Sequence, residues 1–417
     1  MAKALRQYKN LSRVPIANYA RSAFARTGRY NPIAIFERES LWNWLKGTWR
    51  FFIDHRWRPF PWASAAPNGT SVYTVPNHLR ISVAGDWGTG SDEAEQVAKQ
   101  MVHWNGPPDL TVHLGDVYYV GDSPELEENC LGGGPHATRA PQDCVTWPLG
   151  TLGSFALEGN HEMYANGAAY FQEFLPKLGM LGGTGTPQGQ GVSYFCLEND
   201  DWRIVGIDTG YNSVTKMPIL RLFQHGDCKL EPALMDWLRN IVRPKQRPKA
   251  TVLMSHHQYF SGFEGEAYPT PANQLEEFFD SPVIWFWGHE HRFAGYKLFG
   301  SGKLKAHARC IGHGGMPIEF NPLKNDDSGK AVLFYDARRN PLYKEDTLGY
   351  NGFAQLEFQD TKLIINYQSL AVANVGSGDR YKDDPDLLRT ETFEWTGTDF
   401  AITNVANKQE KDFVVRP

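Results

Sequence analysis

The sequence has no long apolar runs. No window of its 417 residues approaches the ~18 consecutive apolar residues of a membrane-spanning helix. Residues 1–30 also lack the apolar core of a secretory signal peptide. We therefore expect no transmembrane helix and no signal peptide, and we predict a cytoplasmic location.

Cysteine is scarce and irregularly spaced. The five cysteines, at positions 130, 144, 196, 228 and 310, are an odd number and show no CxxC spacing. These features exclude a disulfide framework and argue against a structural zinc site built on cysteine. One pairing, Cys130 with Cys144, stays open because it would close a single loop.

Apolar and charged residues are present in ordinary proportions, at 41% and 21% of the chain. This composition is typical of a globular protein and excludes a disordered or collagen-like chain. The length fits one large domain or two of ordinary size.

Charge is unevenly distributed along the chain. Residues 1–60 hold twelve Lys and Arg against three acidic residues, a net charge of +9, whereas the whole chain carries −5 and the remainder therefore −14. Four apolar residues recur there at helical spacing: Leu41, Leu45, Trp49 and Phe52. We interpret residues 1–75 as a basic, aromatic, helical extension that ends near residues 70–76.

Such an extension is expected to pack on the rest of its own chain or on a second subunit of a homo-oligomer. Contact with the periphery of a membrane is the main alternative. Nucleic acid is the least favoured partner.

A β-α-β rhythm begins after the extension. The strand-like run LRISVAG is followed by the helix-like SDEAEQVAKQMVHW, which Ser91 caps, and then by the strand-like LTVHLG. This rhythm favours an α/β fold with helices covering the sheet. Shorter hairpin-like runs after residue 290 predict a second, more antiparallel sheet, and residues 376–417 are assigned to a C-terminal tail.

Five strand-like runs end in a cluster of glycine and polar residues. The clusters are AGDWG (84–88), LGDVYY (114–119), EGNHE (158–162), MSHHQ (254–258) and WGHEH (287–291). In open α/β sheets the ligand site lies beyond the carboxyl ends of the strands, so we expect these clusters to form one cleft. Carboxylate, amide and imidazole groups together indicate a metal site.

The number of candidate ligands exceeds the four of a structural zinc site. A pair of ions ~3.5–4 Å apart fits better, and such a pair suits displacement at phosphorus. A bridging carboxylate is then needed, and Asp116 is the candidate.

In this order the five motifs resemble those of the calcineurin-like metallophosphoesterases, over roughly residues 78–370. Asp86-Trp87-Gly88 lacks the usual histidine, and Tyr119 stands three residues after Asp116. This combination is similar to the purple acid phosphatases, especially the short, mammalian-type, tartrate-resistant branch. The resemblance implies a two-sheet α/β sandwich (α/β/β/α) over residues 76–375.

The resemblance also implies a role for each residue. Asp86, Tyr119 and His291 would bind Fe(III), while Asn160, His256 and His289 would bind Fe(II), Zn or Mn, with Asp116 as the bridge. A phenol of pKa ~10 becomes a ligand near neutral pH only beside a strong Lewis acid, which agrees with a trivalent ion. His256 is preferred over His257 as the ligand. His161 would stabilise phosphoryl charge or protonate the leaving group.

The expected function is therefore hydrolysis of small phosphomonoesters by a metal-bound hydroxide. A phosphodiesterase or nucleotide pyrophosphatase with the same metal core is the alternative. A catalytically silent binding protein is disfavoured because every motif keeps its ligand.

Overall fold

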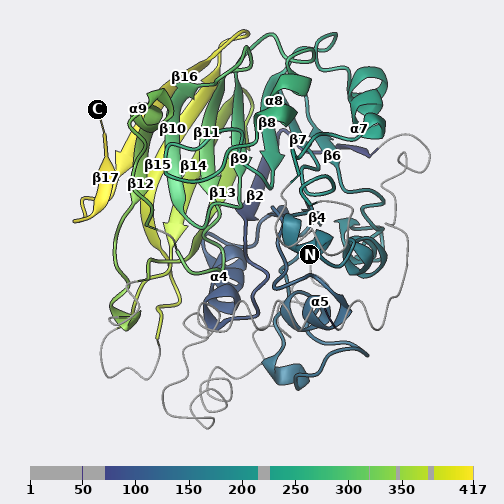
Figure 1. Ribbon diagram of the computed structural model, residues 1–417. Coiled ribbons are helices and arrows are strands. Elements are labelled where there is room, and N and C mark those ends of the chain that lie inside the picture. Colours follow the sequence, from purple (N-terminus) through teal and green to yellow (C-terminus); the bar gives the residue numbers. More distant parts are fainter. Residues whose placement is uncertain are drawn as a thin grey trace.

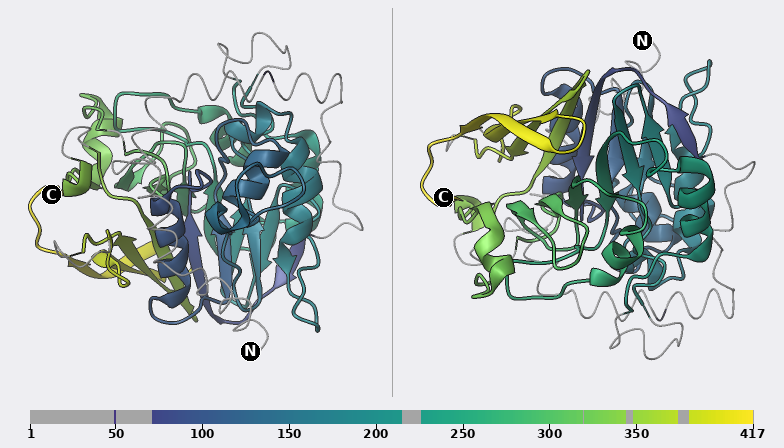
Figure 2. Two further views of the ribbon diagram at one scale, coloured as in Figure 1. Left: turned by 90° about the horizontal axis from the view of Figure 1, so that it is seen from below. Right: turned by 90° about the horizontal axis from the view of Figure 1, so that it is seen from above.

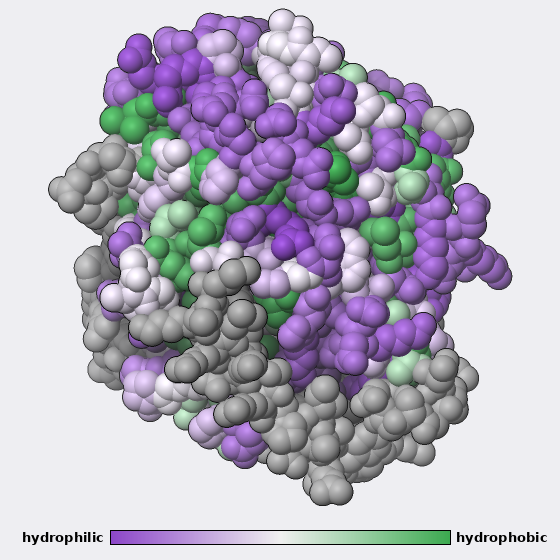
Figure 3. Space-filling view, turned by 180° about the vertical axis from the view of Figure 1, so that it is seen from behind, coloured by the Kyte–Doolittle hydropathy of each residue, from purple (hydrophilic) through white to green (hydrophobic). Residues whose placement is uncertain are grey.

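A computed structural model describes Trp49 and residues 71–214, 226–318, 320–343, 348–373 and 380–416. The predicted N-terminal extension therefore lies outside the described residues, apart from Trp49 and residues 71–75. Within the described ranges, no helix is long and apolar enough to cross a bilayer. On the face in Figure 3, hydrophobic residues form small groups among hydrophilic ones.

Two mixed β-sheets form the centre of the molecule (Figure 1). In the described part of the chain, sheet A has nine strands in the order β1 (Val72–Thr74), β6 (Phe195–Glu198), β7 (Trp202–Gly206), β8 (Ala250–Ser255), β9 (Val283–Trp287), β11 (Ala306–Ile311), β10 (Phe293–Phe299), β12 (Val332–Asp336) and β17 (Phe413–Val415). Sheet B has eight, in the order β16 (Phe400–Asn407), β15 (Asp386–Trp395), β14 (Lys362–Ser369), β13 (Gly352–Gln359), β2 (His78–Ala84), β3 (Leu110–His113), β4 (Gly153–Ala156) and β5 (Gly179–Met180).

Each sheet combines parallel strands with antiparallel ones. Strands β7, β8, β9 and β11 run parallel in sheet A, and β2, β3 and β4 run parallel in sheet B. Strands β10 and β12 extend sheet A with antiparallel pairs, whereas β13 to β16 extend sheet B in the same way. The strands after residue 290 therefore do not form a sheet of their own, and that expectation is wrong.

The two sheets pack face to face around the main hydrophobic core (Figure 2). Side chains alternate across each strand, so Ile81 and Val83 of β2 point inward and belong to the same core cluster as Val252 and Met254 of β8. Because both faces of the central strands are covered, polar residues such as Ser82 and Thr111 are buried along with the apolar ones.

Helices cover the outer faces. Helix α4 (Asp92–His103) begins as predicted, with the Ser91 hydroxyl accepting a hydrogen bond from the Ala94 amide at 3.2 Å, and packs on sheet B. Helix α7 (Pro232–Trp237), its continuation η5 (Leu238–Val242) and α8 (Pro269–Leu275) pack on sheet A. The predicted α/β/β/α sandwich is therefore confirmed.

Short helical elements lie in the connections. They are α5 (Ser123–Asn129), η2 (Pro141–Asp143), α6 (Asn160–Met163), η3 (Tyr170–Phe174), η4 (Leu175–Lys177), α9 (Asp327–Ala331) and η6 (Pro341–Tyr343). Cys130 and Cys144, the pair left open by the sequence, are free thiols.

The ends of the domain lie further out than expected. Strand β1 pairs with β6 inside sheet A, although residues 1–75 were assigned to an extension. Residues 386–415, predicted to belong to a tail, supply β15 and β16 to sheet B and β17 to sheet A. The sandwich therefore begins by residue 72 and uses the chain almost to its last residue.

Candidate metal centre

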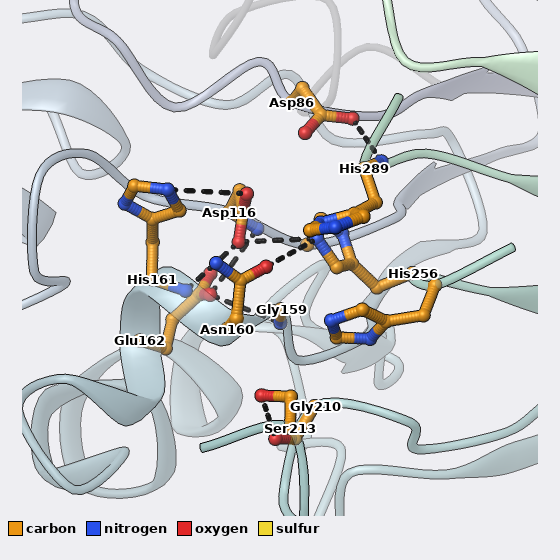
Figure 4. A network of polar contacts seen from close by, with 12 residues as sticks. Asp86, Asp116, Gly159, Asn160, His161, Glu162, Gly210, Ser213, His256 and His289 are labelled. Carbon is orange, nitrogen blue, oxygen red and sulfur yellow. Dashed lines mark hydrogen bonds and ion pairs between the residues drawn. The ribbon is translucent and has the colours of Figure 1, made fainter. Parts of the chain in front are cut away.

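The five predicted motifs follow strand ends in both sheets. Asp86 and Asp116 follow β2 and β3, and Asn160 and His161 follow β4. His256 follows β8, and His289 and His291 follow β9. The contacts described below bring all seven of these side chains into one largely buried cluster. Figure 4 labels six of them: Asp86, Asp116, Asn160, His161, His256 and His289.

The backbone is strained at three of these residues. Asp86, Asp116 and His289 have φ angles of +56°, +75° and +63°, in the left-handed region that side chains with a Cβ avoid. Each such residue costs on the order of 1–3 kcal/mol, and such strain is characteristic of functional sites. A hydrogen bond between two of these residues helps to maintain the strained backbone, because the His289 amide donates to Oδ2 of Asp86 at 2.7 Å.

Glycines before the polar residues make room for the carboxylates. A Cβ on Gly159 would lie 2.1 Å from Oδ1 of Asp116, and one on Gly288 would lie 2.6 Å from Oδ2 of Asp86. Both distances are far below van der Waals contact. Glycine is therefore required for close approach at these points of the EGNHE and WGHEH motifs.

Asp116 occupies the middle of the cluster, between His161 and His256 (Figure 4). Its Oδ1 accepts a hydrogen bond from the His161 amide at 3.1 Å and lies 3.3 Å from Nε2 of His256. Its Oδ2 lies 3.9 Å from Nε2 of His161 and accepts a hydrogen bond from the Tyr118 hydroxyl at 3.0 Å. This central position suits the predicted bridging role.

Near Asp86 and His291 the structure places the hydroxyl of Tyr118. The hydroxyl of Tyr118 lies 2.9 Å from Oδ1 of Asp86 and 3.3 Å from Nε2 of His291. Tyr119 instead presents its carbonyl to the site, where it accepts a hydrogen bond from Nδ1 of His161 at 2.6 Å. The hydroxyl that contacts Asp86, Asp116 and His291 in this structure is that of Tyr118, and the ligand role predicted for Tyr119 stays a prediction.

The second group is Asn160, His256 and His289. Nδ1 of His256 donates to the Leu114 carbonyl at 2.8 Å, which leaves Nε2 to face Oδ1 of Asn160 at 3.2 Å. The ring of His289 lies with its centroid 5.2 Å from that of His256. His257 turns its Nδ1 toward the Thr209 hydroxyl at 3.1 Å, yet donor atoms of His256, His257 and His289 all lie within 4.8 Å of one another, so the preference for His256 stays a prediction.

Burial and charge shift the pKa values in opposite directions. Burial raises the pKa of Asp86 to about 6. Burial also opposes ionisation of Asp116, yet the neighbouring His256 holds the pKa of that carboxyl well below its usual range. In return, despite its burial, His256 has a pKa raised to about 9 by Asp116. Burial lowers the pKa of His289 to about 3.

The donor set fits two metal ions. Its atoms are carboxylate, amide and phenol oxygens and imidazole nitrogens, which suit divalent and trivalent first-row metals. Ligand atoms of Asp86, Asp116 and His256 all lie within 4.8 Å of one another. In this structure His256 offsets the charge of Asp116, and bound ions would offset the charge of both buried carboxylates.

Glu162 is a residue that the sequence interpretation missed. Its Oε2 accepts hydrogen bonds from the Gly159 amide at 3.0 Å and the Asp116 amide at 3.3 Å, so it joins two motifs through their backbones. Burial raises its pKa to about 8. The signal was present, because a glutamate three residues after a helix N-cap is the second half of a capping box.

Two other polar residues, Asp208 and His313, make contacts that stabilise the fold. Asp208 accepts hydrogen bonds from the amides of Gly210 and Tyr211, both at 2.9 Å, and so stabilises a turn. His313 is buried and stacks on Phe293 of the main core at a centroid distance of 5.2 Å.

The sequence comparison identifies the family. Residues 79–293 match the model of the calcineurin-like phosphoesterases, slightly more than half of the chain. The protein belongs to this family. No curated protein matches the chain in sequence.

Solved structures show more distant likenesses. A purple acid phosphatase from yellow lupin (Lupinus luteus) seeds is 15% identical with a TM-score of 0.45, over 74% of this chain and 54% of the lupin chain. PhoD is 12% identical with a TM-score of 0.45, over 81% of this chain and 73% of PhoD. A dimetal phosphatase from Danio rerio is 10% identical with a TM-score of 0.39, over 69% and 95% of the two chains. This chain thus spans about half the length of the lupin enzyme.

Proposed function

We propose that the protein is a phosphomonoesterase of the purple acid phosphatase type with a dinuclear metal centre. One observation carries the proposal. The Tyr118 hydroxyl lies within 3.3 Å of Asp86, Asp116 and His291, where it would become a ligand of the same ion. A phenol in that position distinguishes this type from phosphoesterases whose first motif supplies a histidine.

The pKa of Tyr118 supports a trivalent ion. Burial and the two carboxylates raise this pKa well above its usual value, so the phenolate forms only beside a strongly acidic cation. Fe(III) is the proposed occupant of the Asp86, Tyr118 and His291 group. The Asn160, His256 and His289 group suits Fe(II), Zn or Mn, with Asp116 between the two.

The residues around the ions divide the work. When bound, two such ions supply Lewis acidity that activates water and offsets the charge of a phosphoryl group. His161 is 19% exposed, and the Tyr119 carbonyl fixes its ring through Nδ1. Its Nε2 is therefore free to hold a proton, which we assign to the leaving oxygen of the substrate.

Elemental analysis and a visible absorption spectrum of the purified protein test the proposal. We expect about one iron and at least one further metal per chain, together with a charge-transfer band from the phenolate. A colourless, active protein containing Zn or Mn alone would overturn the iron and phenolate assignment, though not the family.

Substrate class is tested separately. An aryl phosphate monoester should be hydrolysed faster than the matching diester between acidic and neutral pH. A diester preference of tenfold, or ~1.4 kcal/mol in transition-state stabilisation, would instead indicate a phosphodiesterase.

A further inference from the structure

A second group of ligand-type side chains lies outside the metal centre. Donor atoms of Glu127, His136 and Glu173 all lie within 4.8 Å of one another. Glu127 belongs to α5, Glu173 to η3, and His136 to the loop that follows α5. All three residues line one cavity of about 1330 Å³.

Glu127 is fixed in place before any ligand arrives. It is only 4% exposed, and its Oε2 accepts hydrogen bonds from the amides of His136 at 2.6 Å and Ala137 at 2.7 Å. Its Oε1 lies 3.0 Å from Nδ1 of His136. A Cβ on Gly134 would lie 2.2 Å from the carboxyl carbon of Glu127, so a glycine allows the loop to wrap around this carboxylate.

The next residue of α5 fixes the same loop. Oε1 of Glu128 accepts hydrogen bonds from the Thr138 hydroxyl at 2.7 Å and from the Arg139 amide at 2.9 Å. Two adjacent glutamates therefore tie residues 136–139 to α5. The imidazole of His136 stands on backbone that is already ordered, which lowers the entropic cost of binding a ligand.

The charges of the group are unbalanced. Glu127 and Glu173 bring two carboxylates together, and His136 is the one member of the group that can carry a positive charge. A metal ion bound by its imidazole would have to displace that proton. Its hydrogen bond to Glu127 raises the pKa of His136, and Glu173 adds to this effect. A carboxylate pair around an imidazole favours a positive ion at its centre.

We propose that Glu127, His136 and Glu173 form an additional metal site that binds a divalent transition-metal ion of the Zn²⁺ type. Two carboxylates and one imidazole are a donor set that such ions accept. Three protein ligands leave a coordination position for water or for an anionic group of a molecule in the cavity. The ion would also connect the 131–146 loop to α5 and η3, because one ligand comes from each of these three segments.

Metal content of the full-length protein tests this site. After equilibration with micromolar free Zn²⁺ and removal of unbound metal, His136→Asn and Glu173→Gln should each hold one equivalent less than the unmodified protein. His103→Asn is the matched control, because His103 lines the same cavity but is not part of the group. Hydrolysis of an aryl phosphate should be unchanged in all three variants.

The Asp116→Asn background separates this site from the candidate metal centre. In that background one equivalent of Zn²⁺ should remain, and adding His136→Asn should remove it. Equal metal contents in the unmodified protein, His136→Asn and Glu173→Gln would overturn the proposal. So would an equal loss in His103→Asn. Equal unfolding temperatures in a chelator would show that the His136 variant is folded.

Discussion

The hydroxyl of Tyr118 lies 2.9 Å from Oδ1 of Asp86, so a phenol and a buried carboxylate from different motifs face each other across the cluster. Neither group supplies the positive charge that would stabilise the ionised form of the other. Burial raises both pKa values, and the phenol remains protonated until a cation displaces its proton.

The first prediction separates the two adjacent tyrosines. Tyr118→Phe should abolish the visible charge-transfer band and lower the iron content, whereas Tyr119→Phe should keep both. Absorption spectra with elemental analysis of the two variants provide the measurement. Bleaching by Tyr119→Phe instead would return the ligand role to Tyr119.

The second prediction concerns the central carboxylate. Asp116→Asn should weaken binding of both ions by at least about 10–100-fold and abolish hydrolysis, because the amide removes the charge that both ligand groups share. Elemental analysis after dialysis measures the loss. Asp236→Asn, at an exposed position of α7, is the control and should keep full activity. An Asp116→Asn protein with both metals would rule out the bridging role.

The third prediction links His161 to pH. Burial lowers the pKa of His161, so its cation is populated only at acidic pH, and a bound metal would lower that pKa further. A general acid acts in its protonated form, so turnover should rise as the pH falls below ~6.5. His161→Ala should keep its metals, lose ~10²–10⁴ in kcat and lose this rise. An unchanged pH profile in the variant would show that another group supplies the proton.

The fourth prediction concerns stability in acid. Burial lowers the pKa of His313 to about 4, so between pH ~6.5 and pH 4 the unfolded chain binds a proton that the folded protein excludes. His313 therefore contributes a loss of stability as the pH falls through this window, about 2 kcal/mol between pH 7 and pH 5. Urea unfolding in a chelator at the two pH values should show a smaller loss for His313→Leu. Parallel losses would contradict this account.

Much of the site was predictable because the ends of buried strands can be recognised in the sequence. Buried apolar runs that end in glycine and a polar residue placed Asp86, Asp116 and Asn160 at one edge of the sheets. The sequence could not predict which of the adjacent tyrosines points its hydroxyl at Asp86. The backbone of Asp116 is left-handed at φ +75°, and local sequence patterns do not reveal such a conformation at a residue other than glycine.

The C-terminal strands were missed for a different reason. Strand β15 carries Glu391 on a buried face, where it pairs with Arg309 at 2.8 Å and with Arg389 at 2.6 Å. A charged residue that points inward obscures the alternation of apolar and polar residues by which half-buried strands are recognised. Arg309, on a strand distant in sequence, offsets the cost of burying the charge of Glu391. The local sequence around Glu391 gives no indication of this partner.

The pairing of β2 with β13 also bears on when, during synthesis, the chain can bind metal. All candidate ligands have left the ribosome once His291 has emerged, but Asp86 follows a strand whose neighbour begins at Gly352. The amides of Gly314 and Met316, also made later, donate to the carbonyls of Gly85 and Asp86. Such distant contacts slow folding. A nascent chain stopped near residue 300 should therefore carry every ligand and still fail to retain metal, so metal loading follows completion of the chain.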